Sequence, residues 1–74
     1  MKTVMRYAVI VEPAGSNYSA YVPDLPGCAA TGATPLQAKS RIREAIVLHL
    51  EGLRDDGIPF PEARTPGDFV EVAA

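Results

Sequence analysis

One stretch of the sequence is committed to a helix, and specific residues mark both of its ends. Thr34-Pro-Leu-Gln37 has the pattern of a helix N-terminus. A threonine oxygen accepts a backbone N–H, proline fits the first helical position, and a glutamine three residues later bonds back. Gly57 favours a stop, and Pro59 and Pro61 prevent the helix from continuing. The rest of the chain must therefore form short elements that pack against this single helix.

The helix has one apolar side. Its residues recur at intervals of three and four, which places them on one arc: Ala38, Ile42, Ala45, Ile46, His49, Leu50 and Leu53. Val47 is expected to point away from this arc and Leu48 to lie at its margin. This pattern predicts a helix packed on a sheet.

Four segments have the composition of strands: 3–12, 18–22, 28–31 and 69–72. The first is apolar on both faces from Tyr7 to Val11, which predicts a central strand. The intervening segments 13–17 and 23–27 are rich in proline, glycine and asparagine, and they predict turns. The expected fold is α+β, in the order β-β-β-α-β, with a small sheet on one main helix.

The chain has 74 residues, enough for one domain, which we expect to span 1–74. Domains this small have thin cores and usually gain support from a disulfide, a metal or another subunit. Cys28 is the sole cysteine and His49 the sole histidine, so no disulfide can form within the chain, and these two residues alone cannot make a four-ligand zinc site. We therefore expect a homo-oligomer, a dimer or higher, formed through Val47, Leu48 or the sheet edges.

Hydropathy and charge limit where in the cell the protein can be located and which classes of partner it can bind. No apolar run is long enough to cross a membrane or to form a signal peptide, which favours the cytoplasm. The net charge of −2 lacks the basic excess that nucleic-acid binding needs. Residues 51–74 carry six acidic side chains against two basic ones. This acidic third fits a basic partner, or it is only a solvated tail.

Catalytic patterns are missing. Cys28 has no base nearby in the sequence, and His49 lies within the helix on its apolar side. Asp55 and Asp56 precede Gly57 at the predicted helix end, where we expect two exposed surface carboxylates rather than a pair of metal ligands. We therefore predict that the chain is not an enzyme and has no metal, cofactor or catalytic site.

Two motifs resemble those of a known family. Tyr18-Ser-Ala-Tyr-Val-Pro-Asp-Leu-Pro-Gly-Cys28 is similar to the signature of HicB-like antitoxins (the HicB_like or UPF0150-type domain). The family pattern continues with Gly-x-Thr before a helix, here Gly32-Ala-Thr34, and with an Asp-Gly-x-Pro motif, here 56–59. The resemblance extends from residue 5 to about residue 72.

This resemblance implies a truncated ribonuclease-H-like fold without catalytic acids. It also implies a partner, a HicA-like toxin, which is a small basic protein that cleaves mRNA with a histidine. Many members carry a DNA-binding domain after the last strand. Since the sequence stops at Ala74, we expect no such domain and no direct DNA binding.

The function predicted from these points is an antitoxin-like module that covers the toxin's active site. The alternative is an orphan module of the same fold that binds another protein or a small ligand. The candidate partner-binding residues are Asp24, Leu25, Pro26, Asp55, Asp56, Phe60 and Phe69. For the Pro23–Cys28 loop, a second interpretation is that it only closes the fold.

Overall fold

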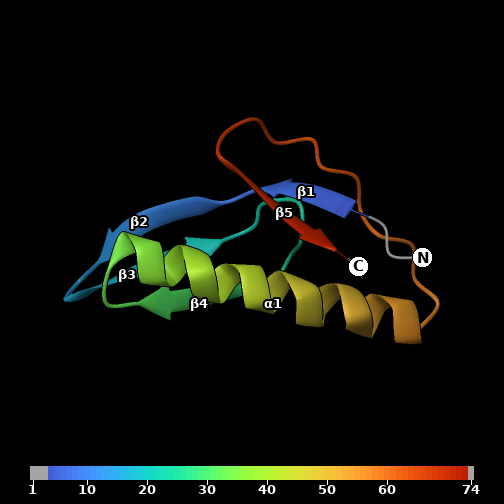
Figure 1. Ribbon diagram of the computed structural model, residues 1–74, viewed down its shortest axis with the longest axis horizontal. Helices are drawn as coiled ribbons and strands as arrows, with labels where there is room; N and C mark the ends of the chain where they lie inside the picture. Colours follow the sequence, from blue (N-terminus) through green and yellow to red (C-terminus); the bar gives the residue numbers. More distant parts are fainter. Residues whose placement is uncertain (1–3, 74) are drawn as a thin grey trace.

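The computed structural model describes residues 4–73. They form five strands and one helix (Figure 1), in the order β1 (Val4–Ala8), β2 (Ile10–Ala14), β3 (Asn17–Tyr21), β4 (Ala29–Gly32), α1 (Pro35–Asp55) and β5 (Phe69–Ala73). The α+β fold predicted from the sequence is confirmed.

β1 and β2 are two halves of one extended run that is interrupted at Val9. β1 pairs with β5 in antiparallel fashion, whereas β2 pairs with β3. The predicted strand 3–12 is thus broken in the middle because its two halves pair with different strands. Val9 continues the first pairing by donating its backbone N–H to Asp68 O at 2.8 Å. The predicted start at Thr3 lies outside the described residues.

The remaining strands follow the predicted segments closely. β2 and β3 form a hairpin in which Ala14 faces Asn17, so only Gly15 and Ser16 lie between them. Gly15 has a φ of 66°, and a glycine with positive φ at the first loop position matches the twist of such two-residue hairpins. β4 pairs with β3 and forms the other edge of this three-stranded sheet.

Both ends of α1 are capped by the residues that the sequence indicated. Thr34 Oγ1 accepts from Gln37 N at 3.1 Å, while Gln37 Oε1 accepts from Ala33 N, one residue earlier than in a standard capping box. At the other end Gly57 has a φ of 70°, and Ile58 donates its N–H to Leu53 O at 2.8 Å. This bond and the one from Gly57 to Arg54 O make a Schellman motif, which ends the helix.

α1 approaches the sheet most closely at β4. A Cβ atom placed on Gly32 would lie 2.4 Å from Ala38 N, which no real contact allows. Glycine at this position and a small residue on the helix therefore bring the two backbones together.

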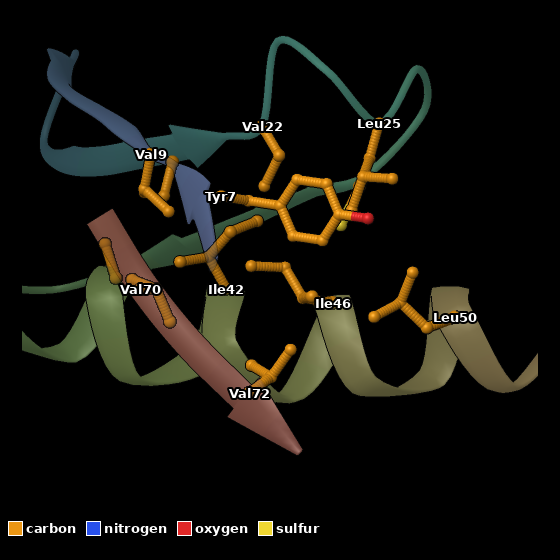
Figure 2. Close-up of a cluster of buried hydrophobic side chains, with 12 residues drawn as sticks. Tyr7, Val9, Val22, Leu25, Ile42, Ile46, Leu50, Val70 and Val72 are labelled. Carbon is orange, nitrogen blue, oxygen red and sulfur yellow. The ribbon is translucent and has the colours of Figure 1, made fainter. Parts of the chain in front are cut away.

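The core lies between α1 and the inner face of the strands (Figure 2). Its largest fully buried side chains are Tyr7, Leu25, Ile42, Ile46, Leu50 and Val70. Each buried aliphatic side chain contributes roughly 1.5–3 kcal/mol relative to an exposed one. The prediction that Val47 points away from the core is wrong, because it is half-buried against the core cluster. Leu48 is 68% exposed, as expected for the margin of the apolar arc. Within the described part of the chain, no helix is both long and apolar enough to cross a membrane.

Candidate protein-interaction site

The Pro23–Cys28 loop is folded tightly by its own backbone. Leu25 N donates to Val22 O at 3.1 Å, and Cys28 N donates to Leu25 O at 3.0 Å. This geometry turns the Leu25 side chain inward, where it is completely buried among core residues (Figure 2). Pro26 next to it is exposed. Of these two predicted site residues, only Pro26 has an exposed side chain.

Asp24 binds a distant part of the chain. Its Oδ2 accepts from the backbone N–H groups of Arg64 and Thr65, at 2.9 and 3.0 Å, and its Oδ1 accepts from Thr65 Oγ1 at 2.9 Å. The bond from the Thr65 N–H is the main cause that lowers the pKa of Asp24 below its ordinary 3.8. Asp24 therefore holds residues 56–68, which we call the connecting segment, against the loop before β4.

Tyr7 makes a second attachment to the connecting segment. Its hydroxyl donates to Pro61 O at 2.7 Å. Burial raises the pKa of this hydroxyl above 10.0, and the negative charge of Asp24 adds to the increase. Sequence reasoning did not identify Tyr7 or Thr65, because nothing in a local pattern indicates which loop a buried hydroxyl or a threonine will meet.

Phe60 lies further along the same segment. It is half-buried and packs against the core, and the Arg54 guanidinium carbon lies 5.5 Å from the centre of its ring. Cation–π contacts of this kind contribute about 0.5–1 kcal/mol at exposed sites. Phe60 thus joins the connecting segment to the last turn of α1 while keeping part of its ring at the surface.

Asp55 and Asp56 lie exposed at the C-terminal end of α1, with Glu51 one turn earlier. Helix C-termini carry a partial negative charge, so acidic side chains there are unfavourable by about 0.3–1 kcal/mol each. No ion pair within residues 4–73 neutralises any of these three carboxylates. Arg54 in the same turn offsets one of the three charges, so the helix end keeps a net negative charge; we call it the acidic helix end.

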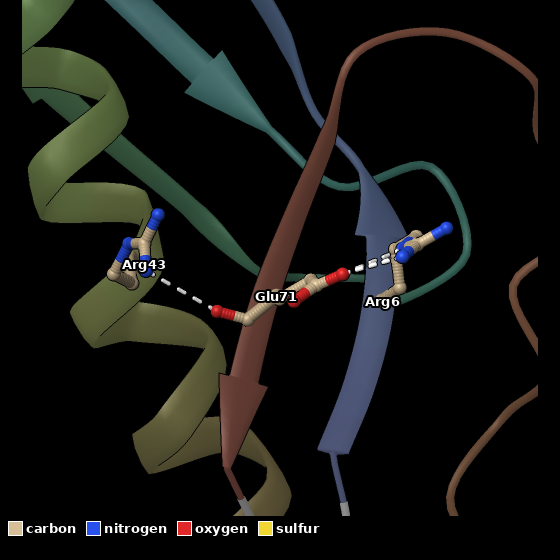
Figure 3. Close-up of polar contacts among 3 residues, drawn as sticks. All are labelled: Arg6, Arg43 and Glu71. Atoms are coloured by element: carbon tan, nitrogen blue, oxygen red, sulfur yellow. Dashed lines mark hydrogen bonds and ion pairs between the residues drawn. The ribbon is translucent and has the colours of Figure 1, made fainter.

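The other acidic residues of the C-terminal third are partly compensated. Arg6 donates from Nε and Nη2 to Glu71 Oε1, and Arg43 donates to the Glu71 backbone oxygen at 3.3 Å (Figure 3). Glu62 pairs with Arg64 at 3.6 Å. The acidic bias read from the sequence thus acts mainly at the acidic helix end.

Phe69 belongs to a different part of the surface. It opens β5, is 45% exposed, and has the Arg6 guanidinium 5.9 Å from its ring centre. In Figure 1 the start of β5 lies well away from the C-terminal end of α1. The predicted residues are therefore not one cluster, because Phe69 is separated from Asp55 and Asp56.

The two candidate reactive side chains sit in ordinary structural positions. Cys28 is buried, and burial raises the pKa of its thiol, which keeps it protonated and a poor nucleophile. His49 is half-buried along α1. Across residues 4–73, no group of three or more His, Cys, Asp or Glu is arranged to hold a metal ion.

Comparison with known proteins agrees with this arrangement of motif and fold. The family model of HicB-like antitoxins of bacterial toxin–antitoxin systems matches residues 7–71. An uncharacterized 14.9 kDa protein from the rep-hol intergenic region of Haemophilus phage HP1 (strain HP1c1) is 36% identical over 66 residues, which are 89% of this chain. The matched region spans 50% of that relative's length.

A solved structure supports the same assignment. A chain of a HicA3 and HicB3 toxin–antitoxin complex superimposes with a TM-score of 0.66 and 28% sequence identity, over 86% of this chain and 71% of the other. The chain therefore belongs to the HicB-like antitoxin family of bacterial toxin–antitoxin systems.

Proposed function

We propose that this protein neutralises a small basic HicA-type toxin by covering the surface with which the toxin binds and cleaves mRNA. The observation that carries the proposal is the acidic helix end. Three exposed carboxylates gather where the helix dipole is already negative, at a cost to the stability of the helix. Stability does not explain this placement, whereas attraction of a basic surface does.

Charge alone gives an interface its association rate and orientation more than its affinity. Tight binding also needs apolar contacts near the charged surface. The exposed part of Phe60, together with Ile58 at 49% exposure, adjoins the acidic helix end along the chain. We assign the apolar contacts to these residues, with Pro26 as a further candidate, and we assign Leu25 and Asp24 to holding the fold.

The test is a neutralisation assay with a HicA-type toxin encoded beside this protein. Purified toxin should lose its RNA-cleaving activity when the protein is added in excess at low salt. Asp55→Lys with Asp56→Lys should slow association and reduce its dependence on salt, while circular dichroism shows an intact fold. A toxin that stays fully active in excess protein would contradict the proposal.

The proposal also includes that the protein self-associates, that it acts in the cytoplasm, and that it has no catalytic activity of its own. The alternative, an orphan module serving another protein or a small ligand, predicts that no neighbouring toxin gene exists. It also predicts that charge reversal at the acidic helix end leaves the protein's native complexes unchanged. Affinity capture from the native host with the wild type and the Asp55→Lys, Asp56→Lys variant separates the two.

A further inference from the structure

The strands present a face that no helix covers. α1 lies along one side of them (Figure 1), and it is the one helix of residues 4–73. Side chains alternate along a strand, so Tyr7 and Val9 point into the core while the residues between and beside them point the opposite way. We call that opposite side the outer face; on β1 and β2 it carries the exposed Arg6 and Glu12, the half-buried Ile10, and Ala8, which is only 1% exposed.

Large apolar side chains gather on the outer face. Phe69 is the cross-strand partner of Ala8, and Tyr21 is the partner of Ile10, so both share this face. Val4, Tyr21 and Phe69 are 66%, 36% and 45% exposed, and they are half of the six large exposed hydrophobic residues in the described chain. Antiparallel sheets commonly leave one face to solvent, so it is the gathering of apolar side chains on this face that favours a contact with another chain.

Two of the sheet edges are less available than this face. Arg41 donates to Thr31 O on β4 at 3.1 Å, and Arg43 donates to Glu71 O on β5 at 3.3 Å. A backbone carbonyl on each of these two edge strands is thus occupied by an arginine from α1, which hinders pairing with another strand there.

The charges of the outer face are complementary to themselves. Arg6 lies towards one end of the β1–β2 run and Glu12 towards the other, with Ala8 and Ile10 between them. A two-fold rotation that lays one outer face on another brings Arg6 of each copy over Glu12 of its partner. Arg6 donates to Glu71 from only two of its three nitrogens, so Nη1 can meet this second carboxylate.

We propose that a second copy of this chain packs face to face on the outer face, with Tyr21, Phe69 and Ile10 in the contact and Arg6 opposite Glu12. This inference rests on the self-association included in the proposed function and names its surface. Alternation gives three outward positions in each of β1, β2, β3 and β5 and two in β4, fourteen in all, of which Ala8 is already buried. A standard interface uses about 20–30 residues on each side, so the dimer is a weak one.

A second copy suits this surface better than a toxin. The charges on the outer face are mixed and largely cancel, whereas a basic RNA-binding protein would favour the acidic helix end. The two surfaces lie apart, so a dimer joined by its outer faces leaves both acidic helix ends accessible.

The experiment is sedimentation equilibrium over a range from micromolar to millimolar protein. Tyr21→Lys and Phe69→Lys are compared with the control Leu48→Lys, which changes an exposed apolar residue of α1 in the same way. The first two should raise the dimer dissociation constant by at least about tenfold, and the control should leave it within about twofold. Glu12→Lys, at the exposed end of β2, should weaken the dimer without touching the core.

The outcomes are distinct. A wild type that stays monomeric at millimolar concentration overturns the inference and the self-association together. A dimer lost in Leu48→Lys but kept in Tyr21→Lys, Phe69→Lys and Glu12→Lys overturns only this surface. Outer-face variants that keep the dimer but no longer neutralise the toxin would assign the face to the toxin instead. Because neutralisation is measured separately, its failure leaves the dimer result standing.

Discussion

The carboxylate of Asp24 accepts three hydrogen bonds from Arg64 and Thr65, residues that lie 40 and 41 positions further along the chain. The loop that contains Asp24 and the connecting segment have no regular secondary structure. Their mutual attachment fixes both, and Tyr7 adds a second attachment nearby. The Pro-Asp-Leu-Pro-Gly motif thus has a structural role within the fold. Its aspartate binds the connecting segment, and its leucine is buried in the core.

Replacing Asp24 by asparagine should destabilise the protein at neutral pH, because one carboxylate oxygen that accepts N–H groups becomes an N–H₂ donor. The folded pKa is below 3.8, so the contribution is present above that pH and lost as the pH falls through the lower folded value. The stability difference between wild type and Asp24→Asn should therefore shrink below about pH 3.8. Urea unfolding at several pH values measures it, with exposed Asp68→Asn as the control. A difference that is independent of pH would argue against the ionised carboxylate.

Tyr7→Phe should lower the free energy of unfolding by about 0.5–1.5 kcal/mol, because it removes one partly buried hydrogen bond and leaves Pro61 O to find water. The tyrosine is neutral in the folded state and its pKa is raised above 10.0. Its contribution is thus complete below that pH and is lost as the pH rises through the folded pKa. Chemical unfolding at neutral and alkaline pH should show the wild type losing its advantage over Tyr7→Phe only in the alkaline range.

Replacing Gly32 and Gly52 by alanine should change the stability of the protein in opposite directions. Gly32→Ala would place a Cβ atom 2.4 Å from Ala38 N, so we expect a loss of about 1–3 kcal/mol as α1 is pushed from β4. Gly52 lies in α1 with open space around its Cβ position, and Gly52→Ala should add up to about 1 kcal/mol. Thermal unfolding of both variants tests this, and equal effects would contradict the close approach.

Leu25→Ala and Pro26→Ala separate the structural part of the motif from its surface part. Leu25 is fully buried, so its truncation should cost about 2–5 kcal/mol. Pro26 is exposed, and its replacement should change stability by less than about 0.5 kcal/mol. If Pro26 contacts a toxin, Pro26→Ala should still raise the dissociation rate in a binding assay. Unchanged binding kinetics would remove Pro26 from the candidate site.

Charge reversal at the acidic helix end should have opposite effects on folding and binding. Asp55→Lys and Asp56→Lys each replace an unfavourable charge at a helix C-terminus by a favourable one, so stability should rise by about 0.3–1 kcal/mol for each. Association with a basic toxin should slow at the same time. Stopped-flow binding and thermal unfolding measure the two effects, and Glu44→Lys, in mid-helix, is the control for the general change in charge. Variants that are more stable and bind equally fast would contradict the role of these residues.

Much of the fold follows from local patterns in the sequence. Thr34, Pro35 and Gly57 mark the ends of α1 correctly, because capping depends only on neighbouring residues. The alternation of the last strand is also local, and β5 forms where it was predicted. The break at Val9 was not predicted, because it depends on a change of pairing partner that local pattern does not contain.

The candidate site was harder to predict for the same reason. A loop with two prolines indicated an exposed Leu25, but the backbone bonds of the loop turn this side chain into the core. Asp55 and Asp56 are exposed as expected, since helix ends with consecutive acids rarely bury them. Whether Phe60 and Phe69 share a surface depends on the path of the connecting segment, and the sequence has no signal for that path.

The pairing of β1 with β5 has a consequence for synthesis of the protein. Val4 lies opposite Ala73, so the first strand finds its neighbour only after nearly all of the described chain has left the ribosome. Until then the β1 edge and the core positions beneath Val70 and Val72 remain open. The hairpin, β4 and α1 can assemble earlier, because their contacts are close in sequence. The domain can therefore be completed only when the last strand has been synthesised, and until then the nascent chain has an open core.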